Sequence, residues 1–87
     1  MYRGRNILVH QQTATTTPAV VGLSGDFISV IIQNDPDSTP DIKLGNATNQ
    51  YLVLEPGKSI TLTMEDCTRL YVKSASDTAT VNILAVR

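Results

Sequence analysis

The sequence predicts a small all-β protein, an antiparallel sandwich or barrel of six to seven short strands with an extended N-terminal arm. Short runs of alternating apolar and polar residues are separated by turn residues at spacings of about ten residues, which is typical of sandwiches and small barrels. No stretch of the 87 residues shows a convincing helical period. We divide the chain into residues 1–26, the arm and first strand, and residues 27–87, the sandwich core.

The strongest β-signal surrounds a Pro-Gly turn. Pro56 presets the first corner of a reversal, and Gly57 supplies the positive φ that a type II turn requires at its second corner. The following strand alternates strictly, so it has one buried and one wet side. Its buried side carries Ile60, Leu62 and Met64, and its wet side carries Ser59, Thr61 and Thr63. Further strands are expected at residues 7–9, 27–34, 42–45, 52–54, 70–74 and 80–87.

The strand at residues 27–34 is apolar on both faces. Ile28, Val30 and Ile32 share one face, and Phe27 and Ile31 share the other. Only one face of a strand in a small sandwich meets the core, so the second face needs another cover. A loop of the same chain and a partner subunit are both open as that cover. We therefore predict Phe27 and Ile31 as partner-binding residues.

The N-terminal region is basic and then rich in threonine. Arg3 and Arg5 open the chain, and residues 11–17 carry little apolar surface with which to fold alone. We favour a surface loop for residues 11–17, and the alternative is an arm that docks on a neighbouring subunit. In the second case Arg3 and Arg5 are predicted to meet acidic groups of a partner.

Composition limits the partners. Seven basic and eight acidic residues give a net charge of −1, so nucleic acid is not an expected partner. No stretch approaches the roughly 18 apolar residues of a membrane helix, and no secretory signal is recognisable, so we expect synthesis in a cytoplasm and no membrane partner. A thin core and a single cysteine, Cys67, favour stabilisation by homo-oligomerisation.

The sequence contains no recognisable catalytic, cofactor or metal motif. His10 is the only histidine, Cys67 is the only cysteine, and nothing in the sequence positions partners for either of them. Asp35, Asp37 and Asp41 gather in one Pro-rich loop, where a solvated turn is favoured over a calcium site. We therefore predict a protein that is not an enzyme and has no cofactor.

Four segments resemble a group of small accessory proteins of tailed-bacteriophage virions. In that group a Leu-Gly pair precedes a Pro-Gly-x-Ser turn, a Leu-Tyr strand, a small-residue turn and a final Val-x-Ile strand. The matching residues of this chain are Leu44-Gly45, 54–62, 70–75 and 80–84. The resemblance covers residues 27–87.

The resemblance implies a β-sandwich module that is commonly trimeric. It implies a capsid decoration, or cement, protein on the virion surface, bound to copies of itself and to the major capsid protein. The alternative is a receptor- or carbohydrate-binding module of a head or tail fibre. A shallow sugar site needs exposed aromatic rings, and Tyr51 and Tyr71 are the candidates.

Overall fold

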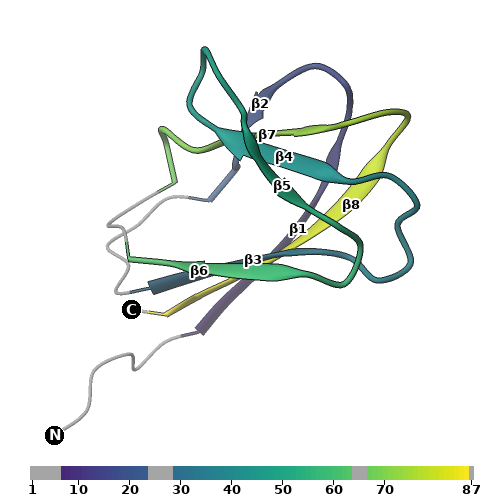
Figure 1. Cartoon of the computed structure of the whole chain (residues 1–87). Helices are drawn as coiled ribbons and strands as arrows, with labels where there is room; N and C mark the ends of the chain where they lie inside the picture. Colours follow the sequence, from purple (N-terminus) through teal and green to yellow (C-terminus); the bar gives the residue numbers. More distant parts are fainter. Residues whose placement is uncertain (1–6, 24–28, 64–66, 87) are drawn as a thin grey trace, which may run out of the picture.

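The computed structural model describes residues 7–23, 29–63 and 67–86, and Figure 1 shows that they form two layers of β-strands. No helix occurs in these residues, and hence none that could cross a membrane. The described strands are β1 (Ile7–Ala14), β2 (Ala19–Val20), β3 (Ser29–Asn34), β4 (Ile42–Gly45), β5 (Leu52–Leu54), β6 (Ser59–Leu62), β7 (Tyr71–Ser74) and β8 (Ala79–Val86).

Both sheets are four-stranded and antiparallel. Sheet A has the order β1-β8-β3-β6, and sheet B has the order β2-β7-β4-β5. Eight strands divided between two sheets in this order form a jelly roll. The predicted all-β antiparallel sandwich is confirmed. The predicted number of six to seven strands is wrong, because β2 is two residues long and is defined by its pairing with β7 rather than by any alternation of its own.

Strand β1 is longer than the sequence analysis expected. Residues 11–14, expected in a loop or an arm, continue the strand and pair with β8 in full register from Ile7↔Val86 to Ala14↔Ala79. The ladder with β8 pairs the backbone N–H and C=O groups of this polar, Thr-rich run, which has little apolar surface of its own to hold it in place. Strands β1 and β2 thus belong to the two sheets, and residues 1–6, with Arg3 and Arg5, lie outside the described residues.

The core lies between the two sheets and is almost wholly apolar. Val30 and Ile32 of β3 are fully buried, as predicted, and Ile31 points to the opposite, outer face of sheet A. The other large buried aliphatic side chains are Val21, Ile42, Leu44, Leu54, Val72, Val81 and Ile83. Ile60 and Leu62 pack against this cluster from β6, while Ser59 and Thr61 face outward. The predicted buried side of β6 is therefore confirmed for the described residues.

The turn between β5 and β6 has the predicted conformation. Gly57 has φ = 85°, the value that the second corner of a type II turn requires. The amide of Lys58 donates to the carbonyl of Glu55 at 2.9 Å and closes the turn. The Gly57 amide donates in turn to the carbonyl of Asn34 at 2.8 Å, so this reversal is tied to the end of β3.

Replacing Gly57 with valine is expected to lower the free energy of unfolding by about 1–3 kcal/mol, because a β-branched residue is strained at positive φ. A Cβ at this position meets no atom within 4 Å, so the loss comes from backbone conformation alone. Urea denaturation of both proteins measures it. Gly57→Asn is the control, since asparagine tolerates this conformation and should lose clearly less. Equal losses in the two variants would contradict the conformational explanation.

Candidate functional site

The outer face of sheet A carries a row of aliphatic side chains. The register places Val9 of β1 beside Leu84 of β8, and Leu84 beside Ile31 of β3. Ile7 and Val86 form the next pair along the same face. We call these five residues the apolar row. Ile7 and Val9 are 65% and 76% exposed, so the row is open to solvent at the β1 side of the sheet.

A hollow of about 300 Å³ lies along the apolar row. Val9, Ile31 and Leu84 form its apolar wall, and Gln33, Ser59 and Asn82 are among its other lining residues. The floor is the sheet itself, so the hollow is a shallow depression in a face and not an enclosed cavity. Such a surface fits an apolar side chain of another protein better than a small, fully enveloped ligand.

A row of amides crosses the same face next to the apolar row. The Gln11 side chain donates to Oδ1 of Asn82 at 2.8 Å, and Asn82 Nδ2 lies 3.1 Å from Oε1 of Gln33. Asn82 Nδ2 also lies 3.0 Å from Oδ2 of Asp35. Three strands, β1, β8 and β3, are therefore linked by side chains as well as by their backbones. We call Gln11, Asn82 and Gln33 the amide row.

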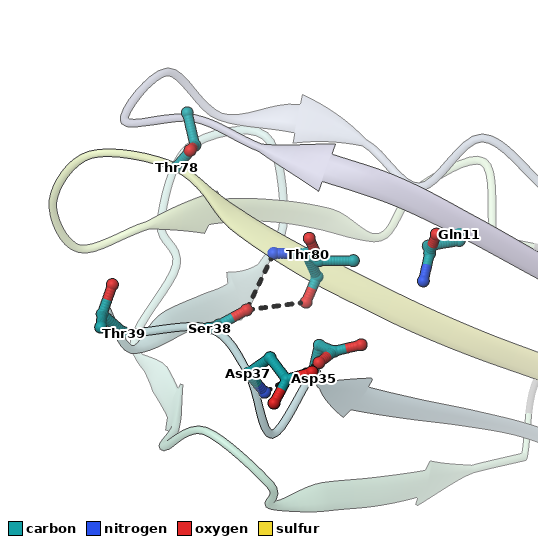
Figure 2. A pocket seen from close by; sticks show the side chains of 7 residues that line it. All are labelled: Gln11, Asp35, Asp37, Ser38, Thr39, Thr78 and Thr80. Atoms are coloured by element: carbon teal, nitrogen blue, oxygen red, sulfur yellow. Dashed lines mark hydrogen bonds between the residues drawn. The ribbon is translucent and has the colours of Figure 1, made fainter.

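Beyond the amide row the face ends in a polar hollow of about 340 Å³, which Figure 2 shows from close by. Its lining is Gln11, Asp35, Asp37, Ser38, Thr39, Thr78 and Thr80. Ser38 binds the backbone of Thr80 twice: its Oγ accepts from the amide at 3.0 Å and donates to the carbonyl at 3.4 Å. Asp35 Oδ1 accepts from the amide of Asp37 at 2.8 Å. Much of the polar lining thus binds the loop to β8.

Of the aspartates in the 35–41 loop, Asp35 contributes its carboxylate to the local structure, and Asp37 and Asp41 contribute backbone groups. Asp35 holds the turn and Asn82, while the backbone carbonyl of Asp41 accepts from the amide of Ala75 at 2.9 Å. Among the described residues no group of three His, Cys, Asp or Glu side chains is arranged to hold a metal ion. The hydrogen bonds of Asp35 agree with the turn that the sequence favours for this loop.

The hydrogen bond from Asn82, followed by that from the amide of Asp37, holds the pKa of Asp35 below its ordinary value of 3.8. A lowered folded-state pKa stabilises the fold above pH 3.8, and that stabilisation is lost as the pH falls through the folded-state pKa. Replacing Asn82 with alanine should raise the pKa of Asp35 and move acid unfolding to higher pH. NMR titration of the Asp35 carboxyl carbon measures the first effect, and an unchanged pKa would contradict the assignment.

His10 and Cys67 have structural surroundings. His10 lies on the inner side of β1, where its Nε2 is 3.2 Å from Oε1 of Gln12. The same Gln12 oxygen accepts from the amide of Gly22 at 2.9 Å, and Gln12 Nε2 donates to the carbonyl of Val20 at 3.2 Å. Gln12 therefore links β1, at the edge of sheet A, to β2 and the residues that follow it, at the edge of sheet B. Cys67 is fully buried in the core cluster.

Two further hollows flank Tyr71 on the sheet B side. One, of about 330 Å³, has Val20, Leu23 and Tyr71 in its lining, and the other, of about 410 Å³, has Asn46, Arg69 and Tyr71. Tyr71 is half-buried and lines both hollows. Tyr51 is 82% exposed, and its hydroxyl donates to Oδ1 of Asn49 at 2.8 Å.

Of the four predicted partner-binding residues, Ile31 lies in the apolar row, and Arg3, Arg5 and Phe27 lie outside the described residues. The sequence analysis missed the contribution of Ile7, Val9 and Leu84 to the same surface. Their alternation is visible in the sequence, but only the register of β1 and β3 on β8 brings them beside Ile31.

No protein-family model matches the chain, and no curated protein sequence matches it. Solved structures do match. A cupin protein from Desulfovibrio desulfuricans superposes with a TM-score of 0.67 at 10% identity, over 99% of this chain and 76% of that one. A de novo designed double-stranded β-helix superposes with a TM-score of 0.59 at 15% identity, over 92% of this chain and 99% of that one. A pilus structure of Bacillus endospore appendages superposes with a TM-score of 0.54 at 17% identity, over 93% of this chain and 85% of that one.

The fold is a cupin-like double-stranded β-helix. At these identities the likeness concerns the fold alone, and it agrees with the jelly-roll strand order of the two sheets. Neither the phage resemblance nor a carbohydrate-binding role is represented among these three structures.

The prediction that the chain is not an enzyme is corrected by the same comparisons. Proteins of this fold include enzymes: DMSP lyases superpose with a TM-score of 0.63 at 10% identity, over 95% of this chain and 40% of that one. The sequence lacks a local catalytic motif, and that lack was the basis of the prediction. In a jelly roll, side chains from distant strands meet across the sheets, so a missing local motif does not exclude catalysis.

The Fe(II) protein HppE shares this fold with a TM-score of 0.56 at 13% identity, over 91% of this chain and 42% of that one. The interior of the present sandwich is a poor match for a metal of that kind. The large side chains buried between its sheets are aliphatic, and the buried polar ones among the described residues are Asn34, Gln50 and Ser74. Of the imidazole, thiolate and carboxylate ligands that transition metals prefer, the described interior offers the buried Cys67 and, on the inner side of β1, His10, and no group of three such side chains is arranged there to hold a metal ion.

Proposed function

We propose that this chain is a structural protein of a tailed-bacteriophage virion, a capsid decoration protein that binds the head through the outer face of sheet A. The observation that carries the proposal is the apolar row. Ile7 and Val9 expose most of their surface beside Ile31 and Leu84, on the face of the sandwich that turns away from its own core. Covering apolar surface stabilises a complex by about 25 cal/mol per Å².

Two further points support the proposal. The phage resemblance covers residues 27–87, which include β3, β6 and most of the hollow beside the apolar row. The Bacillus endospore appendage protein, which forms disulfide-linked pili, shares the fold. A decoration protein acts by mass action, since a ligand that binds only the assembled shell lowers the free energy of that shell.

Ile31→Lys tests this mode of binding. A lysine in the apolar row keeps its stem on the sheet but carries a charge into the contact, so binding to heads should weaken by at least about tenfold. Val20→Lys is the matched control, because it places the same change on an exposed apolar residue of sheet B. Sedimentation of purified heads with each variant measures binding. Equal binding of both variants would exclude the apolar row as the contact.

Electron microscopy of virions locates the wild-type protein. Many copies spread over the head support decoration, and a few copies at the tail support the fibre alternative.

Arg3 and Arg5 are tested separately by a variant with both replaced by alanine, which leaves the sequence of β1 unchanged. Weaker head binding of that variant would assign the arginines to the contact, and unchanged binding would remove them from it.

The fibre alternative has one specific observation in its favour. Tyr71 lines two hollows of about 330 and 410 Å³, with Asn46 and Arg69 in the lining of the second. An aromatic ring flanked by amide and guanidinium donors suits a sugar that stacks on the ring and hydrogen-bonds at its edge. Titration of soluble host polysaccharide should then shift the NMR signals around Tyr71, and Tyr71→Ala should abolish the shifts.

A further inference from the structure

Strand β1 is a long, unprotected sheet edge. It forms one end of sheet A and has eight residues, whereas the other edge strands β2, β5 and β6 have two, three and four. Natural edge strands are usually protected by charged residues, proline, bulges or shortness. The sequence of β1, Ile-Leu-Val-His-Gln-Gln-Thr-Ala, contains no lysine, arginine, carboxylate, proline or glycine. Among the described residues no strand pairs with the outer side of its backbone, so that side can accept another strand.

The side chains of β1 also fit a second β1. Without charged residues, two copies side by side meet no like-charge repulsion. Gln11 extends the amide row to the edge: its Nε2 donates one hydrogen to Asn82, which leaves the second N–H and the oxygen of a group that can both donate and accept. Two such amides facing each other can exchange two hydrogen bonds.

We infer that β1 pairs antiparallel with β1 of a second copy, about a two-fold axis at Gln11. Sheet A then continues through the dimer as an eight-stranded sheet. This inference goes beyond the proposed function, because it concerns the edge of sheet A rather than its outer face, and the purified protein alone tests it.

The register follows from two conditions. Outward-facing residues must lie opposite outward-facing residues, which requires odd positions of β1 to pair with odd positions. The overlap must also be long, which places the axis at residue 10 or residue 11. The axis at Gln11 is selected because it joins the two amide rows end to end, whereas the axis at residue 10 places Gln11 opposite Val9. With the axis at Gln11, Val9 lies opposite Thr13 of the second copy.

A cysteine cross-link tests this register directly. The axis places residue 11 opposite itself, where facing Cα atoms of an antiparallel pair lie about 4.5–5.5 Å apart, within the range of a disulfide. Gln11→Cys should form a covalent dimer under mild oxidation. Thr13→Cys should not, because residue 13 faces residue 9 of the second copy. Wild-type protein is the control for Cys67, which is fully buried.

Light scattering and analytical ultracentrifugation test the dimer without cysteine chemistry. The wild-type protein should be a dimer, and Gln11→Lys, which sets two ammonium groups opposite each other, should raise the dissociation constant at least about tenfold. Thr61→Lys places the same charge on the opposite edge strand of sheet A and should leave it unchanged.

A monomer, a trimer, a Thr13→Cys cross-link in place of the Gln11→Cys one, or equal dissociation constants for the two lysine variants would each overturn the inference. These outcomes are independent of whether the protein binds heads, so failure here and failure of the proposed function are distinguishable.

Discussion

Replacing Gly45 with alanine should lower the free energy of unfolding by more than about 3 kcal/mol, which for a chain of this size is a fall in melting temperature of more than about 12 °C. Gly45 ends β4, and the turn that follows folds back over it. A Cβ there overlaps the backbone carbonyl oxygen of Asn49 and lies 2.6 Å from Cα of Gln50. Both obstacles are backbone atoms, so no side-chain rotation relieves the overlap.

The turn over Gly45 has little freedom to move away. The Asn46 amide donates to the Asn49 carbonyl at 2.9 Å, and Asn46 Oδ1 accepts from the amides of Thr48 and Asn49 at 2.9 and 2.7 Å. Gly22→Ala is the matched control: the nearest atom to its Cβ is His10 Nε2, at an ordinary contact distance of 3.5 Å. Calorimetry of both variants measures the difference. Similar melting temperatures would show that the turn adapts.

Replacing Asn34 with leucine should cost about 3 kcal/mol, although leucine is similar in size and more apolar. Asn34 is fully buried, and its Nδ2 donates to the carbonyls of Pro40 and Leu54, both at 3.0 Å. Removing the donor takes one hydrogen bond from each of two carbonyls, at about 1–3 kcal/mol each, and the loss of the buried Oδ1 of Asn34, which has no hydrogen-bond partner among the described residues, offsets part of that cost. Chemical denaturation measures the loss. Gln33 precedes Asn34 in β3 and lies on the outer face of the sheet. Gln33→Leu should therefore cost less than about 1 kcal/mol.

An aspartate at the same position separates hydrogen bonding from size. The carboxylate of Asn34→Asp would direct its charge at two carbonyl oxygens in the core, which raises its folded-state pKa above the ordinary value. With a raised folded-state pKa, stability is greatest below the unfolded-state pKa and is lost as the pH rises through the folded-state pKa. The variant should therefore be more stable at pH 4 than at pH 7 relative to wild type. The opposite trend would contradict the donor role of residue 34.

The sequence predicted those parts of the fold that depend on local chemistry. The Pro56-Gly57 turn, the inward face of β6 and the inward positions of Val30 and Ile32 follow from turn residues and alternation. Strand β2 and the second half of β1 could not be predicted in this way, because their strand character comes from pairing with β7 and β8.

The candidate site was predictable only in part, for a related reason. Ile31 was identifiable because its strand is apolar on both faces, but its neighbours come from β1 and β8, which are distant in sequence. Asn34 was missed altogether. The sequence places it next to Asp35-Pro36, where asparagine is an ordinary turn residue, and only its burial between the Pro40 and Leu54 carbonyls reveals its role.

The pairing of the first described strand with the last one also determines how the chain can fold. Strand β8 is the neighbour of both β1 and β3. Its pairs with β1, such as Ile7↔Val86, join residues that lie far apart in the sequence. A nascent chain therefore cannot complete sheet A until β8 has left the ribosome, and folding dominated by such distant contacts takes milliseconds to seconds. Until β8 is synthesised, β1 has no strand to pair with. A chain that is cut short before residue 79 therefore leaves the edges of β1 and β3 that normally pair with β8 exposed, and it is a target for aggregation or proteolysis.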